Sequence, residues 1–236
     1  TLGGMMGPMT EEAAVIADLL KQVPLFANLT EAEYGMLAEV MTVRKFPKDC
    51  MVIWAEDEGD GFFIIQSGEV KVTVNASDGR EVILSSLGPS DFFGDMSLLD
   101  GQPRSANVVT LLPTEALVLR RVDFLRALQR HPSIAVHLMV ALAARLRKAD
   151  HQTANLALLG IADRICHVLM EIAEEDGVQT EEGVVIRRRP THQMIASMSG
   201  TARETVTRVL KQLSDDGYIR SEGRELVIVK QSEFVG

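Results

Sequence analysis

Residues 92–106 read FFGDMSLLDGQPRSA, and they gather a glycine, a carboxylate and an arginine in one short segment. Arg104 carries a forked donor that matches phosphate oxygens, and the Asp95 carboxylate can accept hydrogen bonds from sugar hydroxyls. The Ser105 hydroxyl and backbone N–H groups at the start of a short helix would add further donors. The segment therefore suits a small ligand with a phosphate and a sugar. A surface turn with a solvated arginine fits the same residues, and both interpretations are open at this point.

The sequence on either side of this segment is typical of short strands separated by turns. The clearest strand-like runs are 51–54, 62–66, 70–74, 82–84, 106–111 and 116–119. Valines at 70, 72 and 74 alternate with polar residues, as in a half-buried strand. Asp78-Gly79 is a strong hairpin signal between two of these runs. Many short strands at close spacing predict a compact antiparallel barrel or roll.

Helices are predicted on both sides of the roll. The apolar spacing of residues 11–21 indicates one helix, and Thr30 with Glu33 forms a capping box that opens a second helix through Val40. A return to helix is expected from Val122.

A long helix is expected from about Ser133 to Asn155, after Pro132. Its apolar stripe consists of Ile134, Leu138, Leu142 and Leu146, with Met139 beside them. Such a stripe fits packing on its own domain or pairing with a copy of the chain. Residues 161–173 indicate another helix, and residues 174–183 are expected to form an acidic turn region.

The C-terminal part predicts a helix-turn-helix. Residues 191–198 form the first expected helix, Ser199-Gly200 the turn, and residues 201–204 a capping box for the second helix. One face of that second helix is apolar, with Val206, Val209, Leu210 and Leu213. The opposite face carries Arg203, Glu204, Thr207, Arg208 and Lys211. Residues 218–221 and 226–229 are expected to form a small hairpin around Gly223.

Arginine can donate to guanine O6 and N7, and glutamate can accept from cytosine N4, so this polar face suits base edges in the major groove. An ordinary amphipathic helix with solvated charges is the alternative. The glycine turn, the expected hairpin and the local charge together favour DNA binding.

The charge is unevenly distributed along the chain. The 236 residues carry a formal net charge of -9, yet residues 187–236 hold nine Lys and Arg against six Asp and Glu. A mildly basic C-terminal part on an acidic body indicates that only this part faces a polyanion.

Composition limits the class of protein. Apolar residues make up 46% and charged residues 24%, which is typical of a globular protein. The length of 236 residues allows one large domain or two small ones. No apolar run approaches the ~20 residues of a membrane helix, and no secretory signal is evident in the Gly- and Met-containing leader of residues 1–9. Cys50 and Cys166 are far apart in sequence and have no metal-binding spacing, which fits a reducing cytoplasm.

The two motifs, in this order and separated by a long helix, resemble those of the CRP/FNR family of bacterial transcription regulators. The likeness extends from about Val23 to Val229. Residues 93–106 resemble the family's cyclic-nucleotide phosphate-binding cassette, and residues 200–211 resemble its recognition-helix signature.

The resemblance implies an α+β fold with three parts. These are an N-terminal antiparallel β-roll that binds a cyclic nucleotide and has a cupin-like jelly-roll form (1–132), a long dimerisation helix (133–157) and a C-terminal winged helix-turn-helix (158–236). The resemblance further implies a cytoplasmic homodimer that binds palindromic double-stranded DNA, with half-sites about one helical turn apart. RNA polymerase is the further partner that it implies.

The resemblance also implies roles for individual residues. Arg104 and Ser105 would hold the cyclic phosphate, with Gly94 and Asp95 at the ribose. The whole implied effector site comprises Gly94, Asp95, Met96, Ser97, Arg104, Ser105, Ala106, Ala149 and Asp150. The implied DNA-binding set comprises Thr191, Gln193, Arg203, Glu204, Thr207, Arg208 and Lys211, of which Thr191 and Gln193 would contact backbone phosphate. No catalytic residue is expected.

Two positions depart from the family's cyclic-AMP pattern. The cassette carboxylate is usually glutamate, and Asp95 is one methylene shorter. Ala149 and Asp150 stand where cyclic-AMP-binding members carry Thr-Ser facing adenine. An ionised carboxylate only accepts hydrogen bonds, and guanine offers N1–H and N2–H₂ side by side. Cyclic GMP is therefore a candidate beside cyclic AMP, unless Asp150 faces solvent or pairs with Arg147 or a nearby lysine. Cyclic di-GMP fits less well, because the Arg-Ser-Ala end of the cassette suits one compact cyclic phosphate.

Other effectors and classes fit the residues less well. An iron–sulfur cluster needs about four cysteine ligands, and the chain has two. All five histidines lie beyond the expected roll, which argues against haem, against a metal site and against a cupin-like metal enzyme. A regulator that is ligand-independent, or that responds to another effector, is the nearer alternative.

Overall fold

The computed structural model describes residues 10–76 and 79–229, and the chain forms two compact units. The first unit comprises residues 1–74 and 84–146, and the second comprises residues 75–83 and 147–236. Helix α5 (Pro132–Leu158) contributes to both units. The expected leader of residues 1–9 and Asp78 of the hairpin signal lie outside the described residues.

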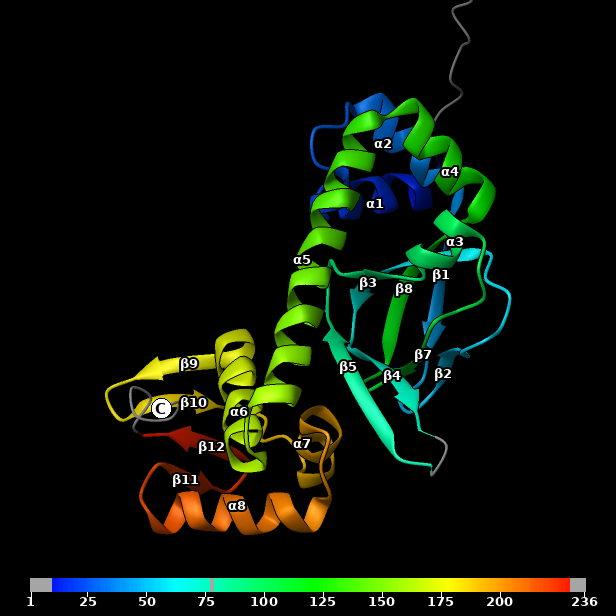
Figure 1. Ribbon diagram of the computed structural model, residues 1–236. Helices are drawn as coiled ribbons and strands as arrows, with labels where there is room; N and C mark the ends of the chain where they lie inside the picture. Colours follow the sequence, from blue (N-terminus) through cyan, green and yellow to red (C-terminus); the bar gives the residue numbers. More distant parts are fainter. Residues whose placement is uncertain (1–9, 77–78, 230–236) are drawn as a thin grey trace, which may run out of the picture. The chain divides into compact units, whose positions relative to one another are not determined.

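Two four-stranded antiparallel sheets form a β-roll (Figure 1). The first sheet has the order β1–β8–β3–β6, with β1 (Met41–Phe46), β8 (Thr114–Arg120), β3 (Gly61–Ser67) and β6 (Phe92–Phe93). The second has the order β2–β7–β4–β5, with β2 (Met51–Ile53), β7 (Asn107–Thr110), β4 (Val70–Asn75) and β5 (Glu81–Leu87). The predicted roll is confirmed, and each of the six predicted runs overlaps a strand.

Apolar side chains from both sheets fill the interior of the roll. This core consists of Phe46, Ile53, Phe63, Ile65, Val70, Phe93, Val108 and Ala116. The rings of Phe63 and Phe93 stack with their centroids 4.9 Å apart. Phe93 is the last residue of β6, so this stacking fixes the backbone just before the quoted segment turns at Gly94.

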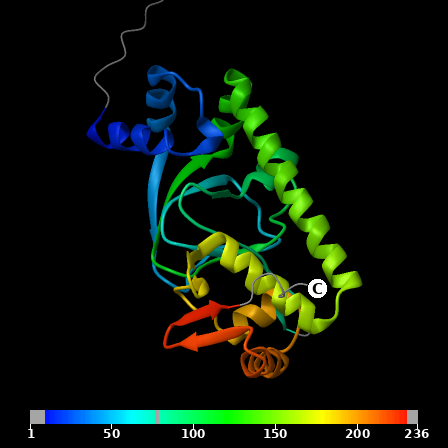
Figure 2. The same cartoon turned by 90° about the vertical axis from the view of Figure 1, so that its left-hand side faces the viewer.

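Helices gather at one end of the roll in both views (Figures 1 and 2). They are α1 (Glu11–Leu20), α2 (Glu31–Ala38), α4 (Arg121–Arg130) and the first turns of α5. They share one apolar core with the neighbouring face of the first sheet. The predicted capping box of α2 is present, because the Thr30 hydroxyl accepts from the Glu33 N–H and the Glu33 carboxylate accepts from the Thr30 N–H.

The two sides of α5 have different roles. Ile134 and Leu138 are fully buried in the core of the first unit, with Leu142 packed beside them. Much of the predicted stripe therefore packs on its own domain. Leu146 and Met139 are instead 63% and 60% exposed. Together with Val136 and Val140 they form a second apolar face, opposite the buried one at helical spacing.

The second unit is a winged helix-turn-helix. Its helices are α6 (Ile161–Asp176), α7 (His192–Ser199) and α8 (Arg203–Asp215). Its antiparallel sheet has the order β11–β12–β10–β9, with β9 (Gly177–Thr180), β10 (Gly183–Ile186), β11 (Ile219–Glu222) and β12 (Glu225–Ile228). The fully buried Ile165, Leu169, Ile195 and Val206 hold α6, α7 and α8 on one core.

The prediction of an acidic turn region over residues 174–183 was wrong. Helix α6 continues to Asp176, and β9 pairs with β10 as an antiparallel hairpin. Strand β9 is largely exposed and only four residues long, so it carries no alternation of apolar and polar residues. Its pairing with Val184 and Ile186, which are buried in the core, keeps it in the sheet.

Candidate functional site

The quoted segment folds as a strand, a short helix and a loop. Strand β6 ends at Phe93, Gly94 turns the chain with φ 83°, and α3 (Asp95–Asp100) follows directly. A Cβ at residue 94 would lie 2.7 Å from Arg104 Nη1 and 2.8 Å from the Gly61 carbonyl oxygen. Only glycine combines this backbone conformation with so close an approach.

Arg104 is the charged centre of the segment, and only 6% of it is exposed. Its Nη1 donates to the Gly94 carbonyl at 2.7 Å, and its Nη2 donates to the Gly61 carbonyl at 2.8 Å. Burial lowers the pKa of Arg104, while the nearby charges of Asp60 and Asp95 act in the opposite direction. The guanidinium remains charged in this setting, so the structure holds a positive group at the predicted phosphate position.

Gly59 makes room for that guanidinium. A Cβ at residue 59 would collide with the Nε and Cζ atoms of Arg104 and lie 2.7 Å from the Ser97 Oγ. The backbone beside Gly59 also pairs with the arginine, because the Glu56 N–H donates to the Arg104 carbonyl and the Arg104 N–H donates to the Asp57 carbonyl. The loop between β2 and β3 thus fixes Arg104, which the sequence motif did not reveal.

Asp95 and Arg145 form an ion pair inside the first unit. Arg145 Nη1 lies 2.9 Å from Asp95 Oδ1, the Asp95 side chain is 2% exposed, and Arg145 is 39% exposed. Arg145 also donates to the Phe92 carbonyl and lies 4.5 Å above the Phe92 ring centroid. The predictions from the sequence did not single out Arg145. The missed signal is spacing, since Arg145 follows Leu138 by seven residues and Leu142 by three, on the buried side of α5.

Two buried polar atoms beside this pair have no hydrogen-bond partner within residues 10–76 and 79–229. They are Asp95 Oδ2 and Ser97 Oγ. A buried polar atom without a partner costs about 1–3 kcal/mol, so such atoms usually meet a ligand or water. Both atoms belong to the first turn of α3, and both are suited to ligand hydroxyl groups.

The remaining predicted effector residues fall into two groups. Met96 and Ser105 are exposed and touch each other, with Ser105 Oγ 3.9 Å from Met96 Sδ, and Ala106 is buried beside them. The structure thus brings residues 94–97 and 104–106 together in one place. Ala149 and Asp150 are exposed on α5, in the second unit. Their role in binding a base stays a prediction.

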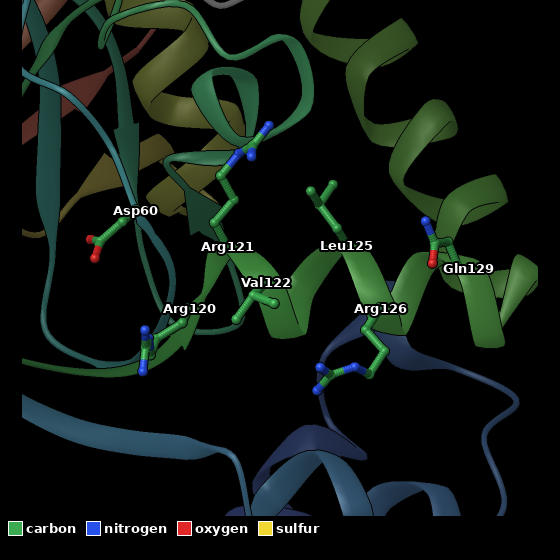
Figure 3. Close-up of a pocket in the computed structure, with 7 residues that line it drawn as sticks. All are labelled: Asp60, Arg120, Arg121, Val122, Leu125, Arg126 and Gln129. Atoms are coloured by element: carbon green, nitrogen blue, oxygen red, sulfur yellow. The ribbon is translucent and has the colours of Figure 1, made fainter.

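A separate hollow of about 540 Å³ lies at the start of α4 (Figure 3). It is lined by Asp60, Arg120, Arg121, Val122, Leu125, Arg126 and Gln129, none of which was predicted for the effector site. Figure 3 shows the Arg121 guanidinium directed away from those of Arg120 and Arg126. Arg121 Nε donates to the Leu98 carbonyl, which ties α4 to α3. Because the arginines do not converge, the hollow is not built as an anion site.

In the second unit, α7 and α8 are joined by the predicted glycine turn. Thr191 caps α7 by accepting from the Met194 N–H, and Gly200 ends the helix with φ 64°. The predicted capping box at residues 201–204 was wrong. The N-cap of α8 is Ala202, which gives no side-chain cap, because the Thr201 N–H bonds back to the Ala196 carbonyl and Thr201 belongs to the preceding turn.

The faces of α8 are as predicted. Val206, Val209 and Leu210 are buried. The exposed residues include all five of the predicted DNA-binding residues on this helix: Arg203, Glu204, Thr207, Arg208 and Lys211. Glu204 has no capping role, so its carboxylate is not committed to the helix end. Gln193 is exposed near the start of α7, with its side chain 3.5 Å from Ser197 Oγ.

The hairpin of β11 and β12 turns at Gly223, with φ 60°, and forms the predicted wing. Arg220 pairs with Glu222 on the same strand and with Glu182 at the turn between β9 and β10. The sequence did not single out Arg189 and His192. His192 Nδ1 lies 2.8 Å from Thr207 Oγ1, and Arg189 Nη2 lies 3.1 Å from His192 Nε2.

Two further properties of the described residues concern membranes and metals. None of the helices placed by the structure is long and apolar enough to span a bilayer. Within residues 10–76 and 79–229, no group of three or more His, Cys, Asp or Glu could hold a metal ion.

Comparison with known proteins agrees with this geometry. Residues 43–131 match the cyclic nucleotide-binding domain, and residues 163–233 match the Crp-like helix-turn-helix domain. The chain is 31% identical to the CRP-like cAMP-activated global transcriptional regulator of Mycobacterium tuberculosis, over 89% of this chain and 94% of the relative. It is 33% identical to the Cyclic AMP receptor protein of Thermus thermophilus, over 91% of this chain and 99% of the relative.

Solved structures show the same fold. The Thermus thermophilus Catabolite Activator Protein is 31% identical, with a TM-score of 0.53, covering 89% of this chain and 96% of the neighbour. The c-di-GMP responsive global regulator CLP of Xanthomonas campestris has a TM-score of 0.74 at 24% identity, covering 84% and 99%. The chain belongs to the CRP/FNR family of cyclic-nucleotide-binding, DNA-binding transcription regulators and is not an enzyme.

Proposed function

We propose that this regulator is a homodimer that binds palindromic DNA under the control of one cyclic mononucleotide, cyclic AMP or cyclic GMP, held in the β-roll. The three parts of this device are the roll with its first helices (1–132), the dimerisation helix (133–157) and the winged helix-turn-helix (158–236). RNA polymerase is the partner through which transcription would respond.

One observation supports the proposed effector site. Two buried polar atoms, Asp95 Oδ2 and Ser97 Oγ, have no hydrogen-bond partner among the described residues and lie in the segment that holds the buried Arg104. A cyclic nucleotide has complementary groups, since its ribose 2′-hydroxyl can donate to Asp95 and its phosphate oxygens can accept from Ser97 and Arg104. Binding would therefore satisfy atoms that have no partner among the described residues, and this gain offsets the cost of desolvating the ligand.

The decisive variant is Ser97→Ala. If Ser97 Oγ is kept for a ligand, the variant is as stable as the parent or slightly more stable, because an unpartnered polar atom has been removed. Its affinity for the cyclic nucleotide falls at the same time. Isothermal titration with cyclic AMP, cyclic GMP and cyclic di-GMP, beside urea unfolding, measures both quantities. Arg130→Gln, at an exposed arginine of α4, is the control.

Three outcomes would count against this proposal. Loss of stability in Ser97→Ala without loss of affinity would give Ser97 a packing role only. Tightest binding to cyclic di-GMP, the effector named for the Xanthomonas neighbour, would replace the mononucleotide with a larger ligand. No binding of any of the three would favour a regulator that is ligand-independent or has another effector.

Asp150 bears on which base is bound. Its exposed carboxylate suits the two adjacent donors of guanine better than the amine of adenine. Asp150→Ser would then weaken cyclic GMP binding more than cyclic AMP binding. Equal changes for both nucleotides, or tighter binding of cyclic AMP by the parent, would remove the preference for guanine.

The second apolar face of α5 supports the homodimer. Val136, Met139, Val140 and Leu146 are each more than half exposed, on the side opposite the buried residues. A contiguous exposed apolar face on a long helix marks an interaction surface, and a copy of the same helix offers a matching one. Met139→Glu would place carboxylates in the seam. Analytical ultracentrifugation should show a dimer for the parent and a monomer for the variant.

The DNA-binding role rests on the exposed face of α8. Arg203, Glu204 and Arg208 would read base edges, and Lys211, Gln193 and Thr191 would contact phosphates. A dimer of such helices requires half-sites about 34–36 Å apart. Selection of bound sequences from a randomised duplex library should return a palindrome with that spacing.

A further inference from the structure

A chain of three hydrogen bonds links the loop before α7 to the exposed face of α8. The Arg189 guanidinium contacts His192 Nε2 at 3.1 Å, and His192 Nδ1 contacts Thr207 Oγ1 at 2.8 Å. The Thr207 hydroxyl is also 3.0 Å from the Arg203 carbonyl, one turn earlier on α8. This series of hydrogen bonds therefore ends on the backbone of Arg203, which is predicted to contact a base.

The donors and acceptors fix the state of the imidazole. Arginine can only donate, so Nε2 must accept and carries no proton. The single hydroxyl hydrogen of Thr207 is given to the Arg203 carbonyl, so its oxygen accepts from Nδ1–H. This assignment, made from the hydrogen-bond network, requires the neutral imidazole with its proton on Nδ1.

The surroundings of His192 favour this neutral form. The loop brings the positive charge of Arg189 toward the ring, and α8 brings that of Arg203. Burial lowers the pKa of His192 below its ordinary 6.5, and these two arginines lower it further. A proton on Nε2 would face the Arg189 guanidinium and abolish the only acceptor that His192 offers to it.

Arg189, at the other end of this hydrogen-bond chain, is also held by its backbone. The Arg189 N–H donates to the carbonyl of Arg224, which lies in the turn of the wing. Arg189 is thus held by the wing on one side and by His192 on the other, at the end of the basic run Arg187-Arg188-Arg189. A guanidinium placed in advance loses less conformational entropy when it meets a phosphate.

We propose that neutral His192 is a positioning residue that holds Arg189 as a DNA-phosphate contact and ties the start of α7 to Thr207 on α8. The proposal rests on α8 being the DNA-reading helix. Thr207 then acts on base reading through the geometry of α8, because its hydroxyl is already bonded to His192 and to the Arg203 carbonyl.

Two double-mutant cycles test the proposal on the full-length protein with cyclic AMP added. Anisotropy of a labelled mixed-sequence duplex, and of a duplex selected by the parent from a random library, gives the affinities. One cycle combines His192→Ala with Thr207→Val, and the other combines His192→Ala with Arg189→Ala. In each cycle the double variant should bind at least about twofold better than the product of the single effects, since contacting residues are not independent.

Lowering the pH should distinguish the His192–Thr207 hydrogen bond from the His192–Arg189 hydrogen bond. Nδ1–H donates in both charge states, so the His192/Thr207 coupling should be the same at about pH 8 and about pH 5. The His192/Arg189 coupling should be present at about pH 8 and should be lost as the pH falls through the lowered pKa of His192, because Nε2 then gains a proton. His192→Asn keeps a donor near the Nδ1 position but has no acceptor at the position of Nε2, so it should retain only the Thr207 coupling, even if His192→Ala folds poorly.

Salt dependence supplies a further readout. Arg189→Ala should lower the slope of log affinity against log salt by about one, because one phosphate contact is lost. Thr207→Val should weaken binding without changing that slope. His192→Ala combined with Lys211→Ala is the control and should be additive.

Additive effects in the Arg189 cycle, or a coupling that does not change with pH, would overturn the proposal while DNA binding by the parent stood. Failure of the parent to bind either duplex would instead count against the DNA-reading role of α8.

Discussion

Arg145, on the long helix α5, donates at 2.9 Å to the buried carboxylate of Asp95, the first residue of α3. The pair joins the cassette to the helix through a single charged contact. The same carboxylate has its second oxygen buried without a partner among the described residues. Asp95 therefore has one oxygen paired with Arg145 and one oxygen that is available to the ligand proposed above.

Arg145→Ala should lower the free energy of unfolding by about 1–3 kcal/mol, because it leaves the Asp95 carboxylate buried and uncompensated. The loss is smaller than for a fully buried pair, since water screens Arg145, which is 39% exposed. Urea unfolding measures the change. Adding Asp95→Asn should restore part of it, and a double variant with the summed losses would show that the two side chains do not interact.

Gly59→Ala should disturb Arg104 directly, because the added methyl group would occupy the position of the guanidinium. A loss of about 1–3 kcal/mol in stability is expected for such overpacking. Nucleotide affinity should fall with it. The single tryptophan, Trp54, is 58% exposed on the same loop, so its fluorescence reports on both changes. Gly79→Ala is the steric control, because no atom of the described residues lies within 4 Å of an added Cβ there; its φ of 84° makes alanine unfavourable through backbone strain alone.

Arg203→Ala should cost about 1–3 kcal/mol of discrimination between the selected palindrome and a single-base variant of it. The reason is loss of a two-point donor to a guanine edge at the start of α8. Competition anisotropy against both duplexes measures the ratio. Equal weakening on both would make Arg203 a phosphate contact.

The stability of the second unit should fall in acid through His192. Its native pKa lies below 6.5, so the unfolded chain takes up a proton at a pH where the native chain does not. The contribution is therefore complete above about pH 6.5 and is lost as the pH falls toward the native pKa. His192→Asn should reduce this part of the acid-induced loss, measured by urea unfolding between about pH 8 and pH 5.

The two cysteines should react at very different rates. Burial raises the pKa of the Cys166 thiol to about 11, with Asp163 adding to the shift, whereas Cys50 is partly exposed. At about pH 8 only on the order of 0.1% of Cys166 would be thiolate, the reactive form. Titration with a thiol reagent should therefore label one cysteine quickly and the second only on unfolding. Rapid labelling of Cys166→Ser would assign the fast thiol to Cys50.

Patterns with a strong local cause were predictable from the sequence. The Thr30 capping box, the glycine turn at Gly200 and the hairpin at Gly223 each depend on a few neighbouring residues. The faces of α8 follow from helical spacing alone. The cassette was found because its residues are contiguous in sequence.

Features decided by distant parts of the chain escaped prediction. Strands β6 and β9 have two and four residues, and their partners in the sheet hold them rather than their own pattern. The roles of Gly59 and Arg145 depend on what packs against them from other elements. The capping box at residues 201–204 failed because the turn after Gly200 uses the Thr201 N–H first.

The buried side of α5 limits how this helix could move in the proposed response to an effector. Turning the whole helix as a rigid rod would expose Ile134 and Leu138, at a cost of about 3–6 kcal/mol for two fully buried aliphatic side chains. An effector typically supplies about 1–3 kcal/mol of coupling free energy. In the proposed response to an effector, the start of α5 would therefore stay in place, and any movement would fall on the part of the helix beyond Leu142, where Arg145 contacts Asp95.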